Sequence, residues 1–177
     1  MSSTALAHAL PAGPAIDQRL FRDVMGHLPT GVVAVTGIEA DTGRPAGMIV
    51  GTFQSLSLTP ALVTFSADRA STSWPRIRTS GRFSVSVLAE HQTDVCQALS
   101  RKGDDKFAGT DWVPSPENGA PHFRGAAAWL DCETVREVDG GDHVIVIGRV
   151  LYMEAGSSEP LVFHRGRLGG YRAPAAV

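Results

Sequence analysis

Apolar residues recur along this chain with two different periods, and the period separates the expected helices from the expected strands. Between Asp17 and Leu28 the apolar positions are spaced close to 3.6 residues apart, which predicts a short amphipathic helix. Residues 83–88 alternate apolar side chains with serine, the pattern of a strand with one buried face. Apolar runs predict further strands at residues 32–36, 47–53, 62–65, 126–138, 143–154 and 161–163.

Turn-forming residues separate these strands at the spacing of hairpins. The segments 41–45 and 139–142 contain the Asp and Gly residues that favour tight turns. Two more short helices are expected at residues 71–80, ended by Gly81, and at residues 91–101, while the proline-rich residues 112–122 are expected to form a loop. Six or more strands joined by short links predict a mainly β protein, an antiparallel barrel rather than a parallel α/β sheet.

Length and composition describe one globular domain. At 177 residues the chain can bury a substantial core but is too short for a second full domain. We expect the domain to cover residues 17–172, between a disordered N-terminal tail at residues 1–16 and a short C-terminal tail at residues 173–177. With 19% charged residues and a formal net charge of -2, the chain has no basic excess that would favour nucleic acid as a partner.

The cysteines and the apolar runs bear on the compartment. Cys96 and Cys132 lack the spacing of a zinc site or of a disulfide framework, so we expect reduced thiols and no metal. No run approaches the roughly 18 apolar residues of a membrane span, and the N-terminus lacks a basic start followed by a long apolar stretch. These features predict a cytoplasmic protein without a membrane partner.

Small and hydroxylated residues gather between residues 47 and 88, where a polar ligand could meet exposed backbone. Ser71, Thr72 and Ser73 stand at an expected helix start. Their oxygens could cap the helix by accepting from first-turn N–H groups, or the same N–H groups could bind a phosphate. No Gly-x-Gly-x-x-Gly or Gly-x-x-x-x-Gly-Lys sequence occurs, so a nucleotide here would not rest on a Rossmann or P-loop turn.

Six short motifs occur in order along the chain. They are Phe21 to Val32, Gly47 to Leu58 followed by Pro60, Ser71 to Ser73, Gly81 to Leu88, Asp105 to Trp112, and Gly141 to His143 with Gly148. Together they resemble the small flavin reductase components of two-component flavin-dependent monooxygenases, over about residues 18–172. The resemblance implies an FMN-binding split barrel: mainly β, antiparallel, with Greek-key connections and a few short flanking helices.

The chain departs from the family pattern at two places. The family often has Thr-x-Ser-Ser-Phe where this chain has residues 49–53, and Val-Asn-Val-Leu where it has residues 85–88. These differences remove hydroxyl and amide side chains but leave the backbone N–H groups. A flavin bound there would therefore depend on backbone contacts, to which Gly51 gives close access.

The resemblance also implies an activity and a set of site residues. It implies an NADH-dependent flavin reductase that reduces FAD, with FMN possible, and passes diffusible reduced flavin to a separate flavin-dependent monooxygenase, acting as a homodimer. His143 would lie at the mouth of the nicotinamide site as the one residue assigned to catalysis. The residues implied to bind the flavin are Thr30, Val50, Gly51, Thr52, Ser66, Ser71, Thr72, Ser73, Lys106, Phe107 and Tyr171.

Each of these residues also has a purely structural interpretation. Gly51 could mark a bulge at a strand end. Lys106 could be a surface charge beside a core aromatic, Phe107, and His143 a solvated turn residue. Tyr171 could make only a tail contact. Two alternative functions also remain open: a split-barrel protein that carries flavin or haem without turnover, and a split-barrel oxidase with tightly bound FMN.

Overall fold

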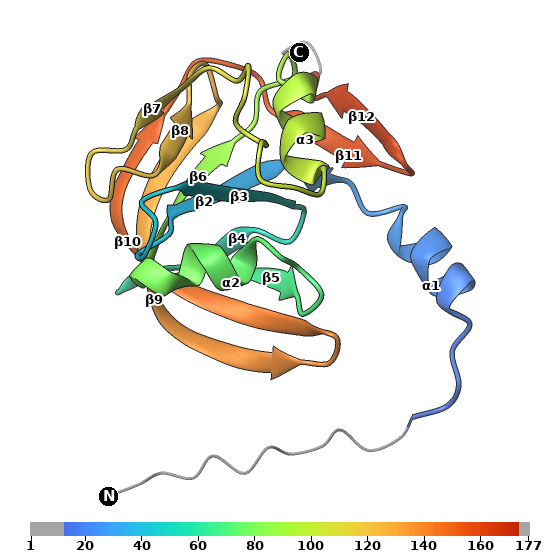
Figure 1. Cartoon of the computed structure of the whole chain (residues 1–177). Coiled ribbons are helices and arrows are strands. Elements are labelled where there is room, and N and C mark those ends of the chain that lie inside the picture. Colours follow the sequence, from blue (N-terminus) through green and yellow to red (C-terminus); the bar gives the residue numbers. More distant parts are fainter. Residues whose placement is uncertain (1–12, 174–177) are drawn as a thin grey trace, which may run out of the picture.

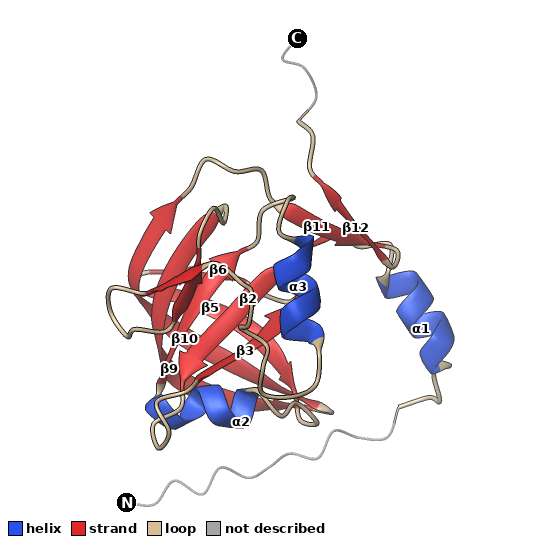
Figure 2. Ribbon diagram, turned by 45° about the horizontal axis from the view of Figure 1, so that its top comes forward, coloured by secondary structure: helices blue, strands red, loops and turns tan. Residues whose placement is uncertain are grey.

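The computed structural model describes residues 13–173. The tails predicted at residues 1–16 and 173–177 therefore lie almost entirely outside the described part of the chain. Strand is the main secondary structure of the described chain, arranged in sheets of seven, three and two strands. Figure 2 shows how the three α-helices lie outside these sheets.

The seven-stranded sheet has the order β3-β2-β6-β9-β10-β5-β4, and every neighbouring pair in it is antiparallel. Its edge strands β3 and β4 follow one another in the chain, and β3 also approaches β5, so the sheet curls into an open barrel. The predicted antiparallel barrel is confirmed. The strands are β2 (Val33–Ile38), β3 (Pro45–Val50), β4 (Gln54–Leu58), β5 (Ala61–Asp68), β6 (Arg82–Val87), β9 (Ala128–Gly140) and β10 (His143–Ala155).

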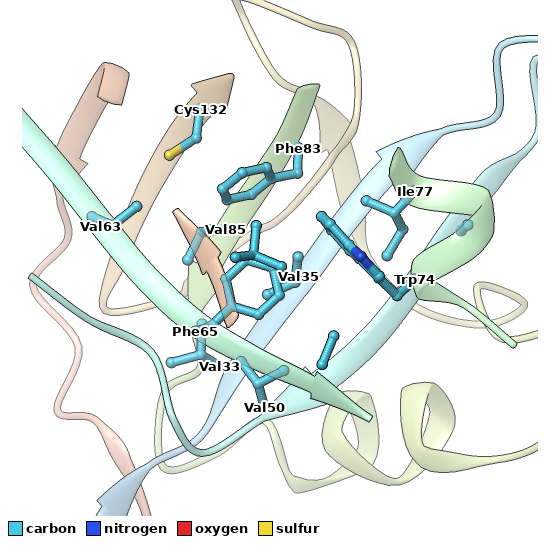
Figure 3. Packing of buried hydrophobic residues seen from close by; sticks show 13 residues of the cluster. Val33, Val35, Val50, Val63, Phe65, Trp74, Ile77, Phe83, Val85 and Cys132 are labelled. Carbon is cyan, nitrogen blue, oxygen red and sulfur yellow. The ribbon is translucent and has the colours of Figure 1, made fainter. Parts of the chain in front are cut away.

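Three aromatic rings fill the inside of the barrel. Phe65 on β5 and Phe83 on β6 meet edge to face, with ring centroids 5.4 Å apart. Trp74 joins them from helix α2 (Trp74–Ile77), with its ring centroid 5.3 Å from that of Phe65. Figure 3 shows these rings among the valines of β2, β5 and β6. Such pairs contribute about 0.5–1.5 kcal/mol beyond their buried area, so α2 is fixed firmly over one end of the barrel.

The helix predicted at residues 71–80 is shorter than expected. Only Trp74–Ile77 is α-helical, and a 3-10 turn, η1 (Arg78–Ser80), follows it. Gly81 ends this segment in the left-handed conformation, with φ of 69°, as the glycine stop predicts. Residues 71–73 thus precede the helix rather than forming its first turn.

A second apolar cluster lies between the barrel and helix α3 (Thr93–Ser100). Leu99 of α3 and Phe107 in the following loop pack over Gly47 of β3. A Cβ atom at Gly47 would lie 2.8 Å from the Phe107 ring, so glycine is required for this close approach. The Phe107 ring in turn stacks parallel on Phe123, with centroids 6.2 Å apart.

Residues 112–122 are not simply a loop, as the sequence predicted. They contain strand β7 (Trp112–Pro114) and most of β8 (Pro121–Phe123), which form a two-stranded sheet. The backbone bond from Ser115 N to Ala120 O, 2.8 Å long, closes the hairpin. Two three-residue strands with paired prolines at their end offer no period to detect, because proline lacks the N–H that a ladder needs.

The C-terminal segment forms a small sheet with residues that follow α1. Strand β1 (Thr30–Gly31) pairs with β11 (Leu161–His164), which pairs with β12 (Arg167–Gly170). The strand at 161–163 was predicted, whereas β1 and β12 were not. The turn between β11 and β12 uses Arg165 and Gly166, both with positive φ.

Helix α1 (Gln18–Met25) stands apart from the barrel, as Figures 1 and 2 both show. Asp17 caps it, because its Oδ1 accepts from the N–H groups of Arg19 and Leu20 at 2.7 and 2.9 Å. None of its residues is buried, although its apolar positions form the predicted stripe. No helix within residues 13–173 combines the length and the apolar character needed to cross a membrane.

Candidate ligand groove

Two neighbouring hollows lie alongside β3, and we call them together the β3 groove. They share Ile49 of β3 and Ser100 at the end of α3, and their volumes are about 380 and 600 Å³. One hollow lies toward the β11–β12 hairpin and the other toward the segment before α2. The groove is open to solvent along its length, which suits a long ligand that enters and leaves.

The hollow toward the hairpin is mainly apolar. Its wall combines the end of β3 with α3, β1 and the β11–β12 hairpin, and comprises Thr30, Gly31, Val32, Ile49, Val50, Gly51, Cys96, Ser100, Phe163, Gly166 and Leu168. Burial raises the pKa of the Cys96 thiol, so this cysteine is a neutral wall residue rather than a nucleophile. A flat, largely apolar ring fits the chemistry of this end.

The hollow toward α2 is the more polar of the two and carries positive charge. It is lined by the hydroxylated residues 71–73 and by Arg101, Lys102 and Lys106, with Asp68 at one side. Three cationic side chains beside three hydroxyl groups are suited to phosphate oxygens. One end of the β3 groove therefore suits an apolar ring and the other suits phosphate. The two ends lie side by side, as these groups do in a flavin nucleotide.

Ser71 and Ser73 have different roles within this polar end. The Ser71 Oγ accepts from the backbone N–H groups of Ser73 and Trp74, at 3.2 and 3.3 Å. The capping function predicted for this cluster thus belongs to Ser71, and it occupies two N–H groups that an anion would otherwise use. Because α2 has only four residues, its dipole adds little, and a phosphate here would depend on side chains.

Lys106 is held inside the polar end rather than extended into solvent. Its Nζ donates to the Gly47 carbonyl at 3.2 Å, to the Leu99 carbonyl at 3.0 Å and to the Ser73 Oγ at 2.9 Å. Burial lowers the pKa of Lys106, and the charge of Arg76 lowers it further. Lys106 is therefore not a free surface charge, since its ammonium makes three hydrogen bonds within the protein.

Several residues implied by the resemblance lie outside the β3 groove lining. Thr52 and Ser66 are hydrogen-bonded to each other, since the Ser66 N–H donates to the Thr52 Oγ1 at 2.9 Å. Phe107 packs in the second apolar cluster, and Tyr171 is 51% exposed beyond β12. The other predicted residues, at positions 30, 50, 51, 71, 72, 73 and 106, are brought together in the groove.

His143 lies next to the groove but does not line it. It is the first residue of β10 and pairs with Asp68 of β5, which lines the polar end. Its Nδ1 lies 2.7 Å from the Asp142 Oδ1, and this hydrogen bond and the imidazole charge hold the pKa of Asp142 below its usual range. The contact leaves Nε2 as the ring nitrogen free to meet a ligand.

Sequence reasoning missed the walls that come from distant elements. Cys96 and Ser100 on α3, and Phe163 and Leu168 on the C-terminal hairpin, line the apolar end. The only signal for the hairpin was Gly166 between two short apolar stretches, which also fits an unstructured tail. No local pattern could show that this hairpin returns to pair with residues 30–31.

Comparison with known proteins identifies the family. The model of the flavin reductase like domain matches residues 25–172. A flavin reductase from Pseudomonas putida is 46% identical over 160 residues, which cover 90% of this chain and 93% of the relative. The reductase subunit HsaB of a flavin-dependent monooxygenase from Rhodococcus jostii is 44% identical, covering 90% of this chain and 80% of its own length.

A solved structure gives the same result. The NADH:FAD oxidoreductase SgcE6 from Streptomyces globisporus, in complex with NAD and FAD fragments, superposes with a TM-score of 0.83 at 34% identity. The match covers 93% of this chain and all of SgcE6. These likenesses confirm the resemblance that the six motifs indicated. The chain therefore belongs to the flavin reductase-like family of oxidoreductases.

Proposed function

We propose that this flavin reductase uses NADH to reduce FAD, and that the reduced flavin then diffuses to a separate flavin-dependent monooxygenase. The observation that carries the proposal is the β3 groove, whose apolar and cationic ends follow one another in an open channel. Relatives named as monooxygenase reductase subunits, and one named as an NADH:FAD oxidoreductase, support the same reaction.

The groove residues fit a flavin. When bound, the flavin supplies the hydride acceptor, so the chain needs no nucleophile of its own. The backbone at Gly51 and the apolar side chains of Phe163 and Leu168 line the apolar end and would hold the flavin ring there. The chain thus orients the ring and shields part of it from water, which converts an encounter between two rings into a reactive geometry.

The choice of FAD is supported by the charge at the polar end. Arg101 and Lys102 extend the cationic wall beyond Ser73 and Lys106, and so provide more positive charge than a terminal monophosphate needs. A diphosphate fits this longer wall. NADH is preferred to NADPH because Arg69, the arginine beside the turn that holds His143, already donates to the Gly141 carbonyl and pairs with Asp139, so it is not free for a 2′-phosphate.

The homodimer is supported by exposed apolar side chains on α1, β4 and β10. Leu58 on the edge strand β4 is 91% exposed, and Met153 on β10 is 71% exposed. On α1, Leu20 and Val24 are also exposed, as the sequence suggested, whereas residues 126–130 are buried or half-buried and offer little surface. Monomers rarely leave a free sheet edge and so many apolar side chains uncovered.

A cytoplasmic location stays a prediction, favoured by two buried thiols.

One experiment separates these functions. The purified protein is placed on one side of a dialysis membrane with NADH under nitrogen, and FAD is added to both sides. Loss of NADH absorbance, followed by reduced flavin on the far side, is the expected result. Protein that is yellow when purified, and that turns over only when air is admitted, would favour an oxidase with bound FMN, because oxygen is then the electron acceptor. No NADH consumption with intact flavin binding would favour a carrier.

A further inference from the structure

The ammonium group of Lys106 has no donor left for a ligand. A lysine ammonium has three N–H groups. All three are used within the protein, by the carbonyls of Gly47 and Leu99 and by the Ser73 Oγ. These acceptors belong to β3, to α3 and to the segment before α2, so Lys106 joins the three elements that enclose the polar end of the groove.

Ser73 is the complementary half of this arrangement. The residue is 4% exposed, yet it lines the polar end of the groove. Because an ammonium can only donate, the Ser73 Oγ must accept in its bond with Lys106, and its own O–H points elsewhere. Within residues 13–173 no acceptor is hydrogen-bonded to that O–H, and although Ser73 is the N-cap residue of α2, its side chain makes no capping hydrogen bond.

The buried Ser73 hydroxyl accepts a hydrogen bond from a cation and has no acceptor for its own proton. It is therefore available to donate a hydrogen bond to a ligand. An anionic oxygen placed in the groove would accept from this hydroxyl and so make the hydrogen bond that it lacks within the described residues. The O–H of the neighbouring Ser71 also has no acceptor within the described residues, but Ser71 is only half-buried, so water can reach it. Ser73 is therefore the more buried of the two serines whose hydroxyl proton has no partner in the protein.

We propose that Lys106 is a positioning residue that fixes the Ser73 hydroxyl as a donor to a phosphate oxygen of the flavin nucleotide, without contacting the phosphate itself. This inference rests on the proposed function, because it takes the groove ligand to be a flavin nucleotide. Lys106 also polarises the Ser73 O–H by donating to its oxygen, which strengthens the bond that the hydroxyl donates.

The test measures flavin binding by quenching of flavin fluorescence in Ser73→Ala, Lys106→Met and the double variant. Riboflavin, which has no phosphate, serves as the matched ligand. Ser73→Ala and Lys106→Met should each weaken FAD and FMN binding roughly tenfold, or about 1.4 kcal/mol, and leave riboflavin binding unchanged. The double variant should be no weaker than Lys106→Met, because both changes remove the same bond. Additive losses would show that Lys106 contacts the phosphate directly and would overturn the proposal.

Two further variants separate position from charge. Lys106→Arg keeps the charge but cannot reproduce three bonds from one compact ammonium, so it should bind FAD as weakly as Lys106→Met. Full rescue by arginine would overturn the proposal. Lys102→Met removes a charge from an exposed lysine in the same groove; its effect should disappear at high salt, whereas that of Lys106→Met should persist.

The remaining outcomes are also decisive. Ser73→Ala removes one oxygen atom only, so it keeps the test valid if Lys106→Met does not fold. Equal losses for FAD and riboflavin would make Lys106 a purely structural residue and overturn the assignment while the reductase function stands. A wild-type protein that bound neither ligand would overturn the proposed function together with it.

Discussion

A methyl group at Gly51 would lie 3.0 Å from the Oγ1 of Thr30, which is closer than carbon atoms of this kind ordinarily approach such a neighbour. The end of β3 and the start of β1 thus touch at a point where glycine alone avoids a displacement. Both residues line the apolar end of the groove. The shape of that end therefore depends on residue 51 being a glycine, which has no Cβ atom.

We predict that Gly51→Val will weaken FAD binding at least tenfold while the apoprotein melting temperature changes little. A β-branched residue suits a strand, but here it displaces Thr30 and covers backbone that the flavin ring would approach. Fluorescence titration and thermal unfolding measure the two effects. Gly169→Val is the matched control, since a Cβ atom there meets nothing within 4 Å. Equal losses of binding and stability in Gly51→Val would make the glycine structural.

His143→Ala is expected to raise the KM for NADH about fivefold, with FAD affinity nearly unchanged. A lost neutral hydrogen bond of about 1 kcal/mol corresponds to an effect of this size. Steady-state rates at varied NADH, together with FAD titration, provide the measurement. His91→Ala, at an exposed position before α3, serves as the control. Unaltered NADH kinetics in His143→Ala would show that this residue is an ordinary solvated turn histidine with no role in NADH binding.

A buried carboxylate that is hydrogen-bonded to a histidine makes stability depend on pH. Asp131 of β9 is fully buried, with its Oδ1 3.0 Å from the His122 Nε2 and 2.5 Å from the Ser84 Oγ. Burial is the largest influence and raises the pKa of Asp131, but hydrogen bonds from His122 and Ser84 together outweigh it and hold the pKa below its usual range. A lowered folded-state pKa contributes stability above the unfolded value, near pH 4, that is lost as the pH falls.

We therefore expect Asp131→Asn to lower the free energy of unfolding at neutral pH by about 1–3 kcal/mol, because it weakens buried hydrogen bonds to a charged group. The same variant should lose less further stability than wild type as the pH falls below about 4. Urea unfolding at a series of pH values provides the comparison. The exposed Asp41→Asn is the control. Identical acid profiles for wild type and Asp131→Asn would refute the assignment.

FAD should be the better flavin, with kcat/KM at fixed NADH at least tenfold above that of FMN. If the diphosphate meets the wall formed by Arg101 and Lys102, then Arg101→Ala should reduce this preference while leaving the rate with FMN nearly unchanged. Arg82→Ala, outside the groove, is the matched control. A tenfold preference for FMN, about 1.4 kcal/mol in transition-state binding, would reverse the flavin choice without affecting the reductase function.

Leu58→Asp should convert a homodimer into a monomer at micromolar concentration, because it places a charge in the proposed apolar interface. Leu58 is the most exposed of the large apolar residues on the described chain, at 91%. Sedimentation velocity measures the change. Ser157→Asp adds the same charge in the loop after β10 and should leave the dimer intact. A wild-type monomer with full activity would contradict the dimer itself.

Local patterns predicted the elements whose own residues determine them. The stripe of α1, the strand at β6 and the Asp-Gly turn between β9 and β10 are all readable within a few residues, and each is present in the structure. The single buried face predicted for β6 is wrong, because Ser84 and Ser86 are buried as fully as Phe83 and Val85. Strands β1, β7 and β12 have two to four residues, so they exist only because a partner strand completes their hydrogen bonds. Such pairings are set by tertiary contacts that no local period records.

The candidate site divides in the same way. Gly51 and Ser73 could be found because the motifs that contain them lie in one stretch of chain. Phe163 and Leu168 could not, since they reach the groove only through the pairing of β11 with β1. The role of Lys106 was also out of reach, because its three acceptors come from three separate elements.

The pairing of β1 with β11 also sets when the protein becomes competent to bind its ligand during synthesis. Chains leave the ribosome N-terminus first, and the β2–β3 hairpin can form early because its strands are neighbours. Thr30 can pair with Phe163 only after β11 has been synthesised, and until then the apolar end lacks the wall that the C-terminal hairpin provides. A ligand bound there stabilises only the completed barrel. The concentration of free flavin in the cell would thus act on the last step of folding, after nearly the whole chain has been made.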